Sequence, residues 1–290
     1  MTEAGTGTHL RARPVKFDWS DTPLHWVPNQ PFMTHFLNYF HVVIPPAERL
    51  FVRFGREGLE RVKSEAVRQA LKGFIAQEAM HSRAQAGALE LLKRQGFETE
   101  EAVELAERVL GYLIGEPTML PLPEAFWRAW RLALGAAGEQ ITCVLGNWVL
   151  TAEALDRAGV DPTMLDLLRW HGAEEIEHRS VLFDVHQDVN GPVEYPLRVA
   201  AIVVIFAVLA GLWVHGTGEL IAQDATLEGR RFDFFAEYAK LAEAELAPGL
   251  DLLKAMLRYL EPAFHPRDGG FDAEAADYLG RSPGLRAAIA

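Results

Sequence analysis

At 290 residues, 49% of them hydrophobic and 10% aromatic, the chain can bury a large core in one domain, or in one domain with an appendage. Its formal net charge of −12, with no basic stripe, argues against nucleic acid as a partner. The single cysteine, Cys143, excludes an internal disulfide and fits a reducing compartment, and residues 1–13 lack the apolar run of a signal peptide. We therefore expect a cytoplasmic protein.

Residues 1–28 combine Gly, Thr and Pro with scattered aromatic residues and show no helical period, so we expect an arm laid on the surface.

A helical pattern begins at Gln30. Pro45-Pro46 is expected to interrupt it, and the helix should resume with Glu48 in its first turn. Because His35 and His41 precede this break, packed or exposed positions are favoured for both over metal binding.

The second expected helix runs from about Ser64 to Gln95 and carries a Glu-x-x-His motif, Glu78 and His81, in an otherwise apolar face. A spacing of three residues places both side chains on one face of a helix, one turn apart, so they can bind one metal ion together. A buried hydrogen-bonded pair is the structural alternative, since unpaired polar groups are costly to bury.

Residues 97–122 are expected to form a short charged helix and a proline-rich crossover, and a third long helix should follow over about 123–158. Small residues surround Glu139 in this helix and allow close helix contact or room for a substrate. Cys143 lies one turn after Glu139.

A fourth helix is expected from Pro162 to about Val189. It carries a second Glu-x-x-His motif, Glu175 and His178, with His171 one turn earlier on the same stripe. Further along the helix, Asp184 or His186 could support a ligand imidazole by hydrogen bonding or could lie at the surface.

A single Glu-x-x-His motif is a weak signal, but the pairing of helices into hairpins adds weight to it. A Glu on the first arm of a hairpin lies level with the motif on the second arm only if the turn falls halfway between them. The midpoint of Glu48 and Glu78 is Lys63, directly before the expected helix start at Ser64.

The second hairpin meets the same condition. The midpoint of Glu139 and Glu175 is Arg157, just before a Gly-Val-Asp-Pro turn. Two hairpins thus predict a shared site for two metals, with one Glu from each of two helices and one Glu-x-x-His from each of the other two. The six candidate metal ligands are Glu48, Glu78, His81, Glu139, Glu175 and His178.

This pattern resembles the ferritin-like di-iron carboxylate proteins over residues 30–190, and more narrowly a bacterial family of predicted metal-dependent hydrolases. The resemblance implies an all-α fold, a ferritin-like four-helix bundle with additional C-terminal helices. It implies an N-terminal arm over 1–28, the di-metal bundle over 29–190, and a C-terminal helical extension packed on the bundle over 191–290.

Two further residues gain a role from resemblance. His171 is similar in position to the extra histidine of di-iron N-oxygenases that oxidise aryl amines, which would make it a seventh metal ligand. Bacterial multicomponent monooxygenases have a small polar residue in the oxygen-binding pocket one turn after the third-helix Glu. Cys143 has that position here and is the candidate catalytic residue, although packing is the common role of a lone buried cysteine.

Residues 199–214 form an apolar run of sixteen residues, fewer than the ~20 that a spanning helix needs. This length favours a buried helix or peripheral membrane contact, and a true span is the alternative. An amphipathic helix over about 231–247 is expected to cover the bundle or a substrate entrance, and a shorter helix should follow to Leu260.

Glu and His ligands suit iron or manganese, whereas structural zinc sites are rich in cysteine thiolates. We therefore expect two iron ions that activate O2 to oxygenate a hydrophobic or aromatic small molecule. An external electron donor would supply the electrons. A reductase partner and a homodimer are compatible with this function. Gln85 occupies the place of the radical-storing tyrosine of ribonucleotide reductase, which argues against radical storage.

Two alternatives remain open. The same ligands would permit di-metal hydrolysis, as the family name states, although the sequence shows no separate nucleophile or phosphate loop. A membrane-associated structural helical protein without catalysis would explain the apolar run but not the paired hairpins.

Overall fold

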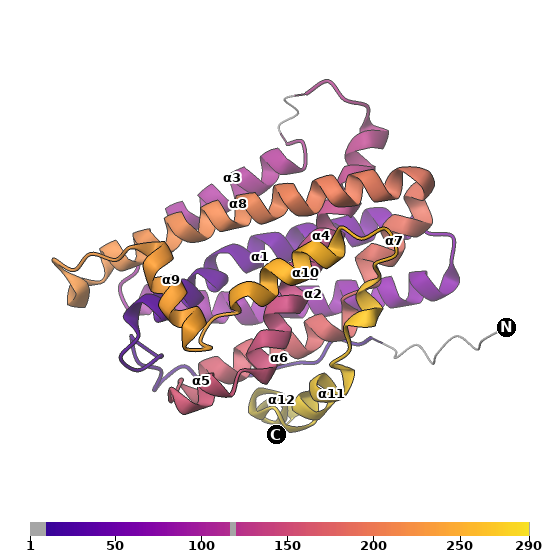
Figure 1. Cartoon of the computed structure of the whole chain (residues 1–290). Helices are drawn as coiled ribbons and strands as arrows, with labels where there is room; N and C mark the ends of the chain where they lie inside the picture. Colours follow the sequence, from indigo (N-terminus) through magenta and orange to yellow (C-terminus); the bar gives the residue numbers. More distant parts are fainter. Residues whose placement is uncertain (1–9, 117–119, 290) are drawn as a thin grey trace.

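The computed structural model describes residues 10–116 and 120–289, and all regular secondary structure in these ranges is helical (Figure 1). The predicted all-α class is therefore confirmed. The α-helices are α1 (Pro31–Leu59), α2 (Glu65–Arg94), α3 (Glu100–Leu113), α4 (Glu124–Thr151), α5 (Glu153–Arg157), α6 (Pro162–His178), α7 (Val181–Asn190), α8 (Glu194–Gln223), α9 (Phe234–Glu243), α10 (Gly249–Tyr259), α11 (Asp272–Arg281) and α12 (Pro283–Ile289).

Helix α1 runs without interruption through Pro45 and Pro46, so the predicted break is wrong. Each proline removes one helical hydrogen bond, but both are buried, as are the apolar residues before them, and α1 packs along the length of α2. Tertiary packing thus outweighs the local cost. As a consequence, Glu48 lies in the middle of a long helix and not in a first turn.

Side-chain caps begin two other helices, and two predicted helices are divided. Ser64 caps α2 by accepting a hydrogen bond from the backbone N–H of Val67, as predicted. The predicted third helix is divided at Ala152 into α4 and α5, and the predicted fourth at Arg179–Ser180 into α6 and α7. The side chain of Asp161 caps α6.

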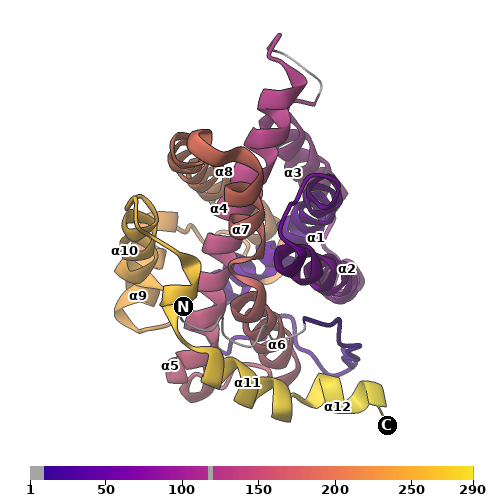
Figure 2. The same ribbon diagram turned by 90° about the vertical axis from the view of Figure 1, so that its right-hand side faces the viewer.

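Four helical arms enclose the interior. Helices α1 and α2 form one antiparallel pair, and α4 packs against α6 and α7 to form the other (Figure 2). The two pairs meet where α2 contacts α6 and α7 and where α1 contacts α4. The backbones of α4 and α6 approach closely at Gly146 and Gly172, where a Cβ on Gly146 would lie 2.7 Å from the Cα of Gly172.

The C-terminal helices cover this assembly. Helix α8 packs on α1 and α4, α10 contacts α4, α8 and α9, and α11 and α12 lie on α6 (Figure 2). Helix α8 contains the predicted apolar run and is longer than expected. It is long and apolar enough to cross a membrane, which by itself is weak evidence for a span. Only 28% of its most apolar stretch is buried, so the expectation of a buried helix is wrong.

The described part of the N-terminal arm, residues 10–28, does more than lie on the surface. Trp26 and Val27 are fully buried, and the carbonyl of Trp26 accepts a hydrogen bond from Asp161 N–H at 2.8 Å. The backbone N–H of Lys16 donates to the carbonyl of Gly284 at 3.0 Å. The arm therefore connects the start of α6 with α12.

Candidate metal centre

The predicted ligand side chains from the four helical arms meet in one buried cluster. Glu175 lies at its centre: its Oε1 atom is 2.8 Å from His171 Nε2, 3.4 Å from His81 Nδ1 and 3.7 Å from His178 Nε2. Glu175 and His178 extend from α6 one turn apart, as the Glu-x-x-His spacing predicts. The cluster contains Glu48, Glu78, His81, Glu139, His171, Glu175 and His178.

Glu78 and Glu48 flank this centre. Glu78 Oε1 lies 3.1 Å from His178 Nε2 and 3.6 Å from His81 Nδ1. Glu48 Oε1 lies 3.4 Å from His171 Nε2 and 4.0 Å from His81 Nδ1. Two overlapping groups have potential ligand atoms within 4.8 Å of one another, and they share His81. One consists of Glu78, His81, Glu175 and His178, and the other of Glu48, His81 and His171.

Glu139 joins the cluster through a histidine. Its Oε2 atom accepts a hydrogen bond from His178 Nδ1 at 2.8 Å, and it belongs to neither of the two groups of converging atoms. The structure thus places Glu139 beside the far nitrogen of His178.

Unpaired polar atoms make this cluster suitable for cations. Both carboxylate oxygens of Glu48 and of Glu78 are buried without a hydrogen-bond partner, as are His81 Nδ1, Glu139 Oε1 and His178 Nε2. Buried polar atoms in folded proteins normally have partners, because an unpaired one costs about 1–3 kcal/mol or more. Metal ions would supply the missing partners, so the donor set fits a pair of cations that prefer oxygen and nitrogen ligands.

The electrostatics of the cluster agree with this requirement. Burial raises the pKa of Glu48 well above its usual value, and the charge of Glu78 raises it further. Burial and the charge of Glu175 raise the pKa of Glu139 in the same way. Burial alone would lower the pKa of His178, but the Glu175 and Glu139 carboxylates outweigh it and raise the pKa to about 9. Burial alone would raise the pKa of Glu175, but the charge of His178 and the hydrogen bond from His171 outweigh it and lower the pKa well below its usual value. Without cations, protons therefore neutralise Glu48 and Glu139, while Glu175 stays ionised.

A second layer of side chains orients the histidines, and sequence reasoning missed most of it. His81 Nε2 bonds to Glu174 Oε2 at 2.9 Å, and Glu174 Oε1 accepts a hydrogen bond from Arg13 at 2.7 Å. Arg13 also binds Glu177 through two hydrogen bonds. Since 161 residues separate Arg13 from Glu174, no local pattern could reveal this contact.

On the other side, His171 Nδ1 accepts a hydrogen bond from Gln85 Nε2 at 2.7 Å, and Gln85 Oε1 accepts one from His41 Nδ1 at 2.6 Å. His41 is thus buried behind the cluster and has no direct contact with the carboxylates. His186 likewise lies away from the cluster, where its Nε2 bonds to the carbonyl of Glu194 at 3.0 Å.

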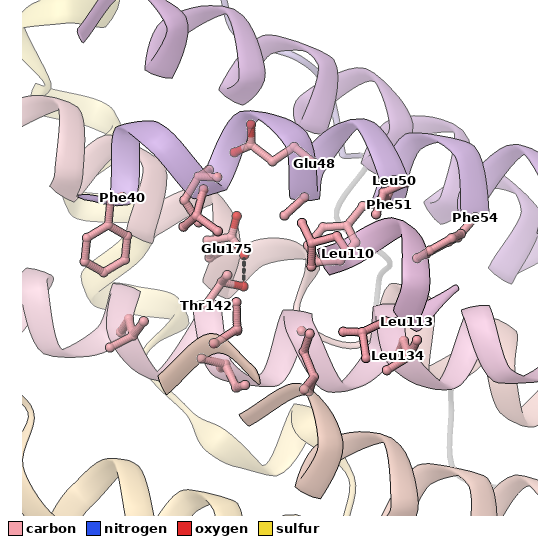
Figure 3. Close-up of a pocket in the computed structure, with 18 of the residues that line it drawn as sticks. Phe40, Glu48, Leu50, Phe51, Phe54, Leu110, Leu113, Leu134, Thr142 and Glu175 are labelled. Carbon is pink, nitrogen blue, oxygen red and sulfur yellow. Dashed lines mark hydrogen bonds between the residues drawn. The ribbon is translucent and has the colours of Figure 1, made fainter. Parts of the chain in front are cut away.

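Thr142, and not Cys143, lies at the pocket position that was predicted for Cys143. Its hydroxyl donates a hydrogen bond to Glu175 Oε2 and lines the cavity beside the cluster (Figure 3). Cys143 lines a different cavity, next to Arg179. At about 100° per residue, Thr142 lies about 60° to one side of Glu139 and Cys143 about 40° to the other, so the two side chains face different sides of α4.

A cavity of about 60 Å³ borders the cluster. Glu48, Thr142, His171 and Glu175 are its polar residues, and Phe, Leu, Ile and Val side chains make up most of the remaining wall (Figure 3). Figure 3 shows Glu48 on one side of this space, with Glu175 and Thr142 across from it. A reacting molecule here would meet the carboxylates from an apolar environment.

A further group of possible ligands, His25, His35 and Asp224, lies elsewhere in the described residues. Asp224 Oδ2 is 2.6 Å from His25 Nε2 and 2.9 Å from His35 Nε2, and Oδ1 accepts two hydrogen bonds from Thr226. All these carboxylate oxygens have partners, so this group is explained as a hydrogen-bonded link between the arm, α1 and the end of α8.

Comparison with known proteins adds family membership to this geometry. Neither the curated proteins nor the solved structures give a match. A family model described as "Predicted metal-dependent hydrolase" matches residues 11–270, which include residues 11–28 of the arm, all seven residues of the cluster, and helices α8 to α10. The chain, with its buried Glu and His groups, belongs to this family of predicted metal-dependent hydrolases.

Proposed function

We propose that the chain is a ferritin-like di-iron enzyme that uses O2 to oxidise an apolar small molecule. The observation that carries this proposal is a cluster of four carboxylates and three imidazoles, with unpaired buried atoms, at the wall of an apolar cavity. Two helical pairs that each contribute one Glu-x-x-His support the ferritin-like assignment. In this proposal Glu48, Glu78, Glu139 and Glu175 are metal ligands together with His81, His171 and His178.

Two bound iron ions would supply the electrons for O2 reduction, and an external donor, such as a reductase, would restore them. Manganese fits the same ligands. The chain itself contributes geometry and a dry environment. Thr142 holds one oxygen of Glu175, Glu174 fixes the ring of His81, and the apolar wall excludes water from the reacting atoms.

Hydrolysis is the second candidate, and the family description favours it. Two metal ions can activate water and bind a scissile group with these ligands. The metal ions could themselves stabilise a developing oxyanion, so hydrolysis would need no separate hydrogen-bond donors. Among the described residues Thr142 is the only hydroxyl side chain that lines the cavity, and because it donates to Glu175 it is not a free nucleophile.

The reaction with O2 separates the two candidates. Protein reconstituted with Fe(II) under anaerobic conditions should consume O2 when exposed to it and develop a near-ultraviolet absorption that disappears on reduction. Protein reconstituted with Zn(II) should show no esterase or phosphatase activity. An active zinc form together with an iron form that is inert to O2 would reject oxidation in favour of hydrolysis.

A further inference from the structure

We propose that the metal cluster is reached by a molecule with a long unbranched alkyl chain, which enters between α8, α9 and α10. This inference names the substrate class for the proposed function and rests on it only for the reaction at the inner end. The binding of the chain itself stands on two neighbouring cavities. The inner cavity, of about 60 Å³, touches the cluster, and the outer one, of about 360 Å³, lies between the C-terminal helices.

The two cavities share a wall. Phe40 of α1, Ile141 and Leu145 of α4, and Leu209 and Trp213 of α8 line both of them. Rotamer changes of these side chains would join the cavities into one passage without a movement of helices. The passage would lead from the surface of α9 and α10 to Glu48 and Glu175.

The outer cavity selects an apolar occupant. Its described lining contains no ionisable side chain other than the phenol of Tyr238. The indole N–H of Trp213, which also lines it, already donates to the carbonyl of Phe36 at 3.0 Å. A ligand with polar groups along its length would lose its hydrogen bonds to water here and gain few in return.

The mouth of the passage is also apolar. Phe235 of α9 and Leu253 of α10 line the outer cavity and are 73% and 49% exposed. Leu250 and Leu257 continue the exposed side of α10 at helical spacing, at 71% and 57% exposure. Large exposed apolar side chains gathered at a cavity mark a binding site for an apolar ligand.

The size of the inner cavity favours a chain over a ring. A cavity of about 150 Å³ is known to accommodate benzene, whereas the inner cavity has only about 60 Å³. Methylene groups in single file need a narrower space than an aromatic ring. We therefore favour a linear alkyl chain over an aromatic molecule as the ligand.

Binding of a series of 1-alkanols, from hexanol to dodecanol, to the metal-free full-length protein tests this inference. Trp213 lines both cavities, so tryptophan emission should change on binding, and Trp213→Phe should abolish most of the change. Each added methylene should lower Kd about fourfold until the passage is filled. For the longer alkanols, an aryl alcohol with the same number of carbon atoms should bind at least tenfold more weakly than the alkanol.

Variants locate the site. Leu209→Trp should block the passage at the shared wall and abolish the gain in affinity for the longest alkanols, while hexanol still binds. The same change at Val203, which is 57% exposed on α8, is the matched control and should alter neither. Leu145→Phe narrows the same wall from α4 and provides the test if Leu209→Trp does not fold.

Equal affinity for all chain lengths, equal affinity for aryl alcohols, or unchanged binding by both wall variants would overturn the inference. Because metal-free protein is used, these results do not depend on the proposed reaction with O2. Failure of the iron form to consume O2 would reject the proposed function and leave the alkyl-chain site in place.

Discussion

Each histidine of the cluster has one ring nitrogen that faces the carboxylates and one that a neighbouring side chain holds. Glu174 holds His81, Gln85 holds His171, and Glu139 holds His178. Such contacts fix the ring orientation and the tautomer of a metal-binding histidine. Glu174 and Gln85, which are not among the proposed ligands, are therefore expected to influence metal affinity without contact with the metal.

Glu174→Gln should weaken metal binding about 10- to 100-fold, because the amide replaces the charge that orients His81. Titration of the metal-free protein with Fe(II) or Mn(II) measures this change. Glu177→Gln is the matched control, since Glu177 also binds Arg13 but has no hydrogen bond to His81. Equal losses in the two variants would show that the salt bridges of Arg13, and not the contact with His81, are important.

Thr142 and Cys143 are adjacent in sequence but line different cavities, so their substitution should have opposite results. Thr142→Val removes the hydrogen bond to Glu175 and should lower the rate of O2 consumption at least tenfold. Cys143→Ala should retain the wild-type rate and metal content. A rate that falls in Cys143→Ala but not in Thr142→Val would restore the role first predicted for the cysteine.

At the scale of elements, α8 depends on small residues where it meets α1. A Cβ on Gly216 would lie 1.8 Å from the ring of Tyr39, which is buried, whereas a Cβ on Gly218 would meet nothing within 4 Å. Gly216→Ala should therefore destabilise the protein by about 1–3 kcal/mol or more, because the ring must move within a packed core.

Gly218→Ala is the control on the same helix and should stabilise the protein by up to about 1 kcal/mol, since alanine is the better helix former. Urea unfolding of both variants measures the two changes. Equal stability of the two variants would show that α8 does not pack on Tyr39 as described.

The helices and the cluster were predictable to different degrees from the sequence. Helical period and turn chemistry are local, so Ser64, Asp161 and the two Glu-x-x-His motifs indicated the hairpins and the convergence of their side chains. The continuity of α1 through Pro45 was not predictable, because it depends on packing against α2.

The side of α4 that faces the cavity could not be predicted from the sequence either. The position of Glu139 fixed where the helix meets the cluster, but only the packing of α1 and α8 decides whether Thr142 or Cys143 faces the free space. Arg13 shows the same limit, since its partners lie on the distant helix α6.

At the scale of the whole molecule, acidic charge is concentrated in the interior as well as on the surface. The chain has a net charge of −12, and four cluster carboxylates are almost completely buried. Buried like charges oppose folding unless protons or cations neutralise them. Metal binding should therefore contribute to stability as well as to chemistry.

The most direct test of this account is the metal content of the purified full-length protein, measured by elemental analysis after reconstitution with iron and removal of unbound metal. We expect about two iron ions per chain, and loss of most of this metal in the double variant Glu78→Ala/Glu175→Ala provided that it folds. A folded wild-type protein that binds no metal, or a folded double variant that keeps both ions, would contradict the account.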